Sequence, residues 1–198
     1  MRRALKTASG LIAALMAASV MVSCKKETSP SNRPTIINTV NTGDAPSMAK
    51  DPDLGKYLIE LTVYDPGNKE KNERWEQHYR IGTDCTLEMY GIFNGKVYRG
   101  KKIGLTNLEY KNIYELVKAN PLETQEVAVY MNNPDGWVRN LISYDKEDKV
   151  KTKIGGTMAS GAAFDRICEL ILSFPNEGEK TEFINNVQTA VNKDYYVG

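Results

Sequence analysis

The sequence is poor in the residues from which metal sites and nucleophilic catalytic sites are usually built: it has one histidine and three cysteines among 198 residues. Zinc sites and the common catalytic triads need several such side chains, so this supply argues against both. An excess of one charge is missing too, because 26 Lys and Arg residues against 25 Asp and Glu residues give a formal net charge of +1. We therefore expect no nucleic-acid partner, which would require a basic surface.

The first 24 residues have the composition of an export signal. Arg2, Arg3 and Lys6 make a positive start, and residues 10–22 form an apolar run without charge. A transmembrane helix needs ~20 apolar residues, and this run is shorter. The sequence therefore predicts a signal peptide at residues 1–23.

The signal ends in Met21, Val22, Ser23 and Cys24. Two apolar residues, a small residue and a cysteine resemble the lipobox of bacterial lipoproteins, with Met21 where that family usually has leucine. The resemblance implies that Cys24 is lipidated and anchors the protein to a membrane; the alternative is an ordinary secretory signal with an incidental cysteine. Residues 25–27 also resemble the surface-export signals of Bacteroidota lipoproteins. Together these resemblances imply an outer-membrane lipoprotein that faces the periplasm or the cell surface.

The rest of the chain divides into a linker and one domain. Residues 25–52 are rich in Ser, Thr, Asn and Pro and lack helical periodicity, so residues 24–52 are predicted to be a lipid-anchored flexible linker. As an alternative, the β-branched residues in 35–40 could form a strand of the domain. Residues 53–198 have the density of apolar residues expected of a single domain.

Local patterns predict the elements of this domain. Asn94-Gly95 is a strong hairpin signal, Thr106 with Glu109 has the spacing of a helix capping box, and Ser160 could cap a second helix. We expect an α+β fold: an antiparallel meander sheet of about six to seven strands, with two or three helices packed on one face. The expected strands are 57–64, 75–81, 85–93, 96–103, 126–131, 137–144 and 149–154, and the expected helices are 106–117, 160–174 and a final amphipathic stretch around 183–191.

The search for catalytic, cofactor and metal residues finds no specific motif. His78 falls in the same strand phase as Glu76 and Arg80, so we expect it on the solvent-exposed face. The glycine-rich residues 155–161 lack the Lys-Ser/Thr pair of a phosphate-binding loop, and residues 145–148 lack the spacing of a calcium loop. Carboxylates that could serve a small envelope hydrolase are Asp84, Glu88, Asp145, Glu147 and Asp148.

Two cysteines remain after Cys24. In an oxidising compartment Cys85 and Cys168 could form a disulfide, or each could be a separately buried thiol, and the sequence leaves both open.

Tyrosine is the residue that stands out, with 11 copies against four phenylalanines. Several tyrosines lie in the strand phase opposite the apolar one, and they suggest either a binding face or a face covered by other parts of the chain. We therefore expect a non-enzymatic domain that binds an envelope protein or a glycan, as an assembly subunit, accessory subunit or inhibitor; a carboxylate-dependent hydrolase is the alternative. The expected binding residues are Tyr64, Tyr90, Tyr130, Trp137 and Tyr144.

Overall fold

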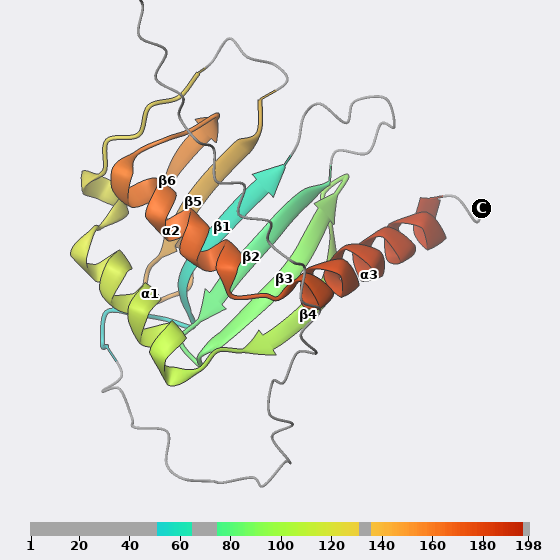
Figure 1. Cartoon of the computed structure of the whole chain (residues 1–198), viewed down its shortest axis with the longest axis horizontal. Helices are drawn as coiled ribbons and strands as arrows, with labels where there is room; N and C mark the ends of the chain where they lie inside the picture. The colour runs from blue at the N-terminus through green and yellow to red at the C-terminus, as the bar shows by residue number, and fades with distance from the viewer. Residues whose placement is uncertain (1–50, 65–74, 131–135, 196–198) are drawn as a thin grey trace, which may run out of the picture. The chain divides into compact units, whose positions relative to one another are not determined.

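The computed structural model describes residues 51–64, 75–130 and 136–195, and this part of the chain forms one six-stranded antiparallel sheet with three α-helices (Figure 1). The strands have the spatial order β4-β3-β2-β1-β5-β6. In chain order the elements are β1 (Tyr57–Tyr64), β2 (Glu76–Gly82), β3 (Thr86–Phe93), β4 (Lys96–Gly104), α1 (Asn107–Ala119), the 3-10 helix η2 (Leu122–Thr124), β5 (Val138–Tyr144), β6 (Val150–Thr157), α2 (Ala162–Ser173) and α3 (Glu177–Tyr195).

The sheet has two unlike faces because side chains alternate along each strand. On the central strand β1, Ile59 and Leu61 are fully buried in the hydrophobic core with residues of the helices. The three helices lie on that one face of the sheet (Figure 1). The predicted α+β fold with helices packed on one face is confirmed.

The strand order departs from a simple meander at one point. Strands β1 to β4 follow one another as antiparallel neighbours, and the tight β3–β4 turn places Asn94 and Gly95 at positive φ, as the hairpin signal predicts. The chain then passes through α1 to the far side of β1, where β5 pairs with it. Strand β1 therefore lies in the middle of the sheet and has both of its edges paired.

The first two helices largely match their sequence signals. Thr106 and Glu109 form the predicted capping box of α1. The buried side of α2 consists of Phe164, Ile167 and Cys168 together with Ile171, as the periodicity predicts. The prediction that Ser160 caps α2 is wrong: Gly161 is the N-cap residue, because Ser160 pairs through its backbone with Ala128.

The predicted strand at 126–131 is not a strand in the described residues. Ala128 makes an isolated bridge to Ser160, and Tyr130 donates a backbone hydrogen bond to Thr157. This segment reaches only the end of β6, so it forms too few contacts to extend the sheet. Met131 lies outside the described residues.

The last helix is attached to the sheet through Phe183. This side chain is fully buried, and its ring meets the edges of Trp75 and Tyr79 with both ring centroids 5.8 Å away. A Cβ atom at Gly100 would collide with the Phe183 ring, so glycine at that position of β4 permits the close approach of α3.

We expect Phe183→Ala to lower the free energy of unfolding by about 3–5 kcal/mol, because it removes a large buried ring and leaves a cavity. Urea denaturation followed by circular dichroism measures this change. The neighbouring Ile184 is 40% exposed, so Ile184→Ala should cost less than about 1 kcal/mol. Equal losses for the two variants would contradict the assigned orientation of α3.

Candidate functional site

The helix-free face of the sheet is organised around one buried carboxylate. Glu60 lies on β1 between the core residues Ile59 and Leu61, so its side chain points to the opposite face, where it is only 2% exposed. Four side chains donate hydrogen bonds to it: His78 Nδ1 at 2.5 Å, Arg80 Nε at 2.5 Å, Tyr90 OH at 2.8 Å and Tyr144 OH at 2.5 Å. We call these five residues the Glu60 cluster.

Aromatic rings surround the charges of the Glu60 cluster. The Arg80 guanidinium lies over the rings of Tyr57 and Tyr90, with its central carbon 4.6 Å and 4.8 Å from their centroids, and Tyr144 is 5.8 Å away. The ring of His78 stacks on Tyr90 at 4.6 Å. These cation–π and stacking contacts cover the ion pair between Arg80 and Glu60 and keep water away from it.

The environment keeps Glu60 ionised. Burial alone would raise the pKa of its carboxyl group, but hydrogen bonds from His78 and Tyr144 and the positive charge of Arg80 outweigh burial and lower the pKa to about 2. Burial raises the pKa of Tyr90 and Tyr144 well above the usual range, so both hydroxyls stay protonated as donors. A carboxylate held in this way at neutral pH does not serve as a general acid.

The prediction that His78 lies on the solvent-exposed face is wrong. His78 is 5% exposed, because Tyr90 covers its ring and its Nδ1 is hydrogen-bonded to the buried Glu60. An ionised carboxylate only accepts hydrogen bonds, so Nδ1–H is the donor. Its other nitrogen, Nε2, lies 3.3 Å from an oxygen of Glu76. His78 does lie on the face opposite the hydrophobic core, as its strand phase predicts, but the phase does not show that bulky neighbours bury this face.

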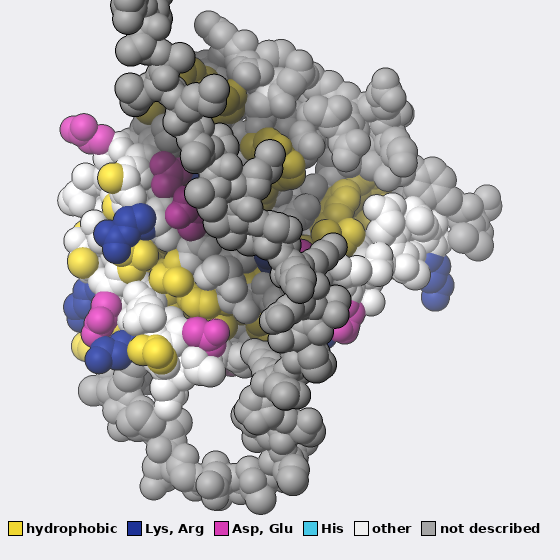
Figure 2. Space-filling model, viewed as in Figure 1, with side chains coloured by type: hydrophobic (Ala, Val, Ile, Leu, Met, Phe, Trp, Pro, Cys, Tyr) yellow, Lys and Arg dark blue, Asp and Glu magenta, His cyan; other side chains and the backbone are white. Residues whose placement is uncertain are grey.

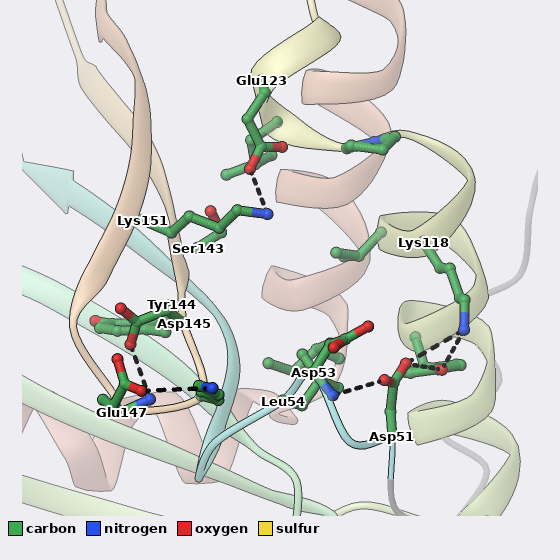
Figure 3. Close-up of a pocket in the computed structure, with 16 residues that line it drawn as sticks. Asp51, Asp53, Leu54, Lys118, Glu123, Ser143, Tyr144, Asp145, Glu147 and Lys151 are labelled. Carbon is green, nitrogen blue, oxygen red and sulfur yellow. Dashed lines mark hydrogen bonds and ion pairs between the residues drawn. The ribbon is translucent and has the colours of Figure 1, made fainter.

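A second feature is an open pocket of about 690 Å³ at one end of the sheet (Figure 3). Its walls come from residues 51–54, the C-terminal half of α1, η2 and the β5–β6 turn. Ion pairs cross its rim: Lys118 Nζ lies 3.2 Å from Asp51, and Lys151 Nζ lies 2.9 Å from Glu123. We call it the α1–β5 pocket. Asp51, within the predicted linker, also accepts a hydrogen bond from Tyr114 at 2.8 Å.

The five candidate carboxylates of a hydrolase do not form one group. Glu88 lies on β3, and both β2 and β1 separate it from β5, which at ~4.8 Å per strand is about 14 Å. Asp84 is in the β2–β3 turn, 3.2 Å from Lys102 Nζ. Burial raises the pKa of Asp84, but hydrogen bonds from Thr86 and Lys102 lower it on balance.

The other three candidate carboxylates belong to the β5–β6 turn. Asp145 accepts hydrogen bonds from the backbone N–H groups of Glu147 and Lys149, both at 2.9 Å, and Asp148 accepts one from Lys56 at 2.6 Å. Asp145 and Glu147 line the α1–β5 pocket. The hydrogen bonds of Asp145 and Asp148 shape the turn and the segment that leads into β1.

The third feature is an exposed apolar surface at the opposite end of the β5–β6 hairpin. Trp137 is 53% exposed and Tyr130 is 61% exposed. The Met158 N–H donates to the Trp137 carbonyl at 2.7 Å and the Tyr130 N–H donates to the Thr157 carbonyl at 3.0 Å, so these residues are neighbours across adjoining segments. With Val129, which lies over Gly156, they form a continuous group, the Trp137 patch: Val129, Tyr130, Trp137 and Met158.

A groove of about 650 Å³ adjoins the Trp137 patch. It is lined by Trp137 and Met158 of the patch and by Val63, Arg139 and Leu172. Arg139 donates hydrogen bonds to the Ala159 carbonyl and to Asp165, so the positive charge of Arg139 is already paired within the protein. The groove therefore offers mostly apolar surface beside an exposed tryptophan.

The structure divides the five expected binding residues into two groups. Tyr130 and Trp137 are exposed together, and Tyr64 pairs with Val138 directly after Trp137. Tyr90 and Tyr144 are buried on the helix-free face with their hydroxyls on Glu60. On the face that carries the helices, acidic and basic side chains of the described residues are interspersed (Figure 2), so charge alone does not select a partner there.

Cys85 and Cys168 are both free thiols in the structure. Cys85 lies in the β2–β3 turn at a φ of 57°, and Cys168 is fully buried on α2. Burial raises the pKa of Cys168 to about 12, so this thiol is unreactive at neutral pH. Cys24 lies outside the described residues.

Comparisons with known proteins give no relative: no protein family, curated protein or solved structure matches the chain significantly. The described residues contain no group of three or more His, Cys, Asp or Glu side chains placed to bind a metal ion. Judged by length and hydropathy, none of the helices in the described part of the chain qualifies as a membrane span.

The lowered pKa of Glu60 predicts how stability depends on pH. Its pKa is about 2 in the folded protein and near 4.5 in the unfolded chain, so between those values the unfolded state binds more protons. We expect the free energy of unfolding to fall by about 3 kcal/mol through this group as the pH drops from about 4.5 to about 2.

Urea denaturation at a series of pH values measures this dependence. Glu60→Gln should remove most of the fall in the free energy of unfolding between about pH 4.5 and about pH 2. Glu76→Gln, which changes a half-exposed carboxyl group, should leave most of that fall in place. An unchanged pH profile in Glu60→Gln would show that Glu60 is not strongly perturbed.

Proposed function

We propose that the protein is a lipid-anchored bacterial envelope protein whose domain is a non-enzymatic binding module, and that the Trp137 patch is its docking surface. One observation carries the proposal. Of the eight large hydrophobic side chains that the described residues expose, four gather in this patch. Exposed apolar residues scattered singly are normal, but a contiguous group beside a groove is typical of an interaction site.

The composition of the patch favours a protein partner. Tryptophan, tyrosine and methionine are enriched at protein interfaces, where rigid rings provide contact area at a low entropic cost. Trp137 has the exposure and the adjoining groove expected of an anchor residue. A glycan is the second candidate, because the exposed rings of Trp137 and Tyr130 could stack on sugars, and the flanking Val129 and Met158 contribute little to that kind of contact.

The membrane anchor in this proposal depends on the signal peptide predicted at residues 1–23 and on the lipobox-like residues 21–24. Lipid chains anchor a protein through the burial of methylene groups, at ~0.8 kcal/mol each, so two or three chains give stable attachment without a transmembrane helix. The linker predicted at residues 24–52 would then leave the domain free to reach a partner.

Cys24→Ser is expected to abolish incorporation of labelled palmitate and to release the protein from the membrane fraction in a bacterial host. Cys85→Ser is the matched control, since Cys85 belongs to the folded domain. Labelling that persists in Cys24→Ser would contradict lipidation at this residue.

Trp137→Ala and Tyr130→Ala are each expected to weaken partner binding by roughly tenfold or more, because an anchor residue at an interface contributes about 1.4 kcal/mol or more. The measurement is quantitative co-purification of the tagged protein from solubilised membranes, followed by titration with the purified partner and, separately, with envelope glycans.

Leu108→Ala is the control for this prediction. Leu108 on α1 is 67% exposed and lies outside the patch, so its removal should leave binding unchanged. Thermal unfolding checks that all three variants are folded. Equal binding by the wild type and the two patch variants would refute the proposed docking surface.

A further inference from the structure

We propose that the α1–β5 pocket binds a primary ammonium group carried on an apolar stem. This inference is independent of the proposed function, because the pocket and the Trp137 patch lie at opposite ends of β5. The six residue steps along the strand from Trp137 to Ser143 span roughly 20 Å at ~3.3 Å each.

The size and the floor of the pocket suit a small ligand or one long side chain. Its volume of about 690 Å³ is in the usual range of ligand pockets, ~300–1,000 Å³. Leu54, Leu58, Val117 and Leu122 supply apolar surface, and Leu58 and Leu122 belong to the hydrophobic core, which gives that surface a rigid support. An aliphatic stem would cover these side chains.

The charge of the pocket favours a cation. Five carboxylates line it (Asp51, Asp53, Glu123, Asp145 and Glu147) against three lysines (Lys118, Lys146 and Lys151), which leaves two negative charges in excess. Each lysine lies within ion-pair distance of a carboxylate: Asp51, Glu147 and Glu123 respectively. Among the described residues, no lysine or arginine lies within that distance of Asp53 or Asp145.

Asp53 and Asp145 differ in how many of their carboxylate oxygens are left to bind a ligand. One oxygen of Asp145 holds the β5–β6 turn, whereas the exposed Asp53 makes no such turn contact through its carboxylate. Asp53 is one of the residues that line the pocket. An ammonium group at the end of the stem could pair with Asp53, which no lysine or arginine of the described residues reaches.

Ser143 is an independent sign of an unfilled site. It lines the pocket, and its hydroxyl oxygen is buried without a hydrogen-bond partner among the described residues. A buried hydroxyl oxygen without a partner destabilises the fold unless a ligand or water pairs with it. The Lys151 side chain, which pairs with Glu123 at 2.9 Å, lies beside Ser143 in Figure 3, so a ligand donor would have to displace it to reach the Ser143 hydroxyl.

The ammonium group could belong to a free alkyl amine or to a lysine side chain of a peptide. Titration of the purified domain with cadaverine and with acetyl-lysine amide distinguishes the two sources, and acetyl-norleucine amide supplies the same stem without the charge. We expect one or both amines to bind in the millimolar range or tighter at low ionic strength, with amide shifts at Leu54, Val117 and Leu122 in two-dimensional NMR spectra.

Asp53→Asn is expected to weaken this binding by about fivefold, the effect of one partly exposed charge pair. Asp84→Asn removes a carboxylate outside the pocket and should leave the affinity unchanged. If neither amine shifts these amides, if acetyl-norleucine amide binds as well as the lysine compound, or if the two variants behave alike, the proposal is overturned. Loss of partner binding in the Trp137 variants would not bear on these outcomes.

Discussion

The buried carboxylate of Glu60 is the constraint on which the sheet depends. A charge removed from water must be hydrogen-bonded throughout, and the donors here come from β2, β3 and β5, on both sides of β1. The helix-covered face is held by apolar contacts, which tolerate small displacements. On the helix-free face, a shift in register would leave Glu60 without its partners, so we infer that this cluster specifies the pairing of the four strands.

Sequence reasoning predicted the features that are encoded locally. The Asn94-Gly95 turn, the capping box of α1 and the buried side of α2 all depend on residues within a few positions of one another. The Glu60 cluster joins Glu60 to side chains 18 to 84 positions away in the sequence. One sequence does not reveal the strand register that brings them together. The burial of His78 depends on that register. The predicted strand at 126–131 is not formed in the described residues, because they make one isolated bridge at Ala128 and one further backbone hydrogen bond from Tyr130.

The β5–β6 hairpin connects the two surfaces to which we assign functions. At one end it carries Trp137 and Met158, and at the other Ser143 and Asp145 line the α1–β5 pocket. Tyr144 lines that pocket and also donates a hydrogen bond to Glu60, so the pocket wall is joined to the Glu60 cluster. Both surfaces therefore include residues of the β5–β6 hairpin, and sites built on strands position their side chains more precisely than sites on loops.

The most direct test of the central claim is site-specific photo-crosslinking in cells that produce the lipidated protein. A photoreactive amino acid is placed in turn at positions 130, 137 and 108, and the products are identified by mass spectrometry. The account predicts the same discrete product from positions 130 and 137 and none from position 108. No product from the patch, or one pattern shared by all three positions, would contradict a docking surface at Trp137.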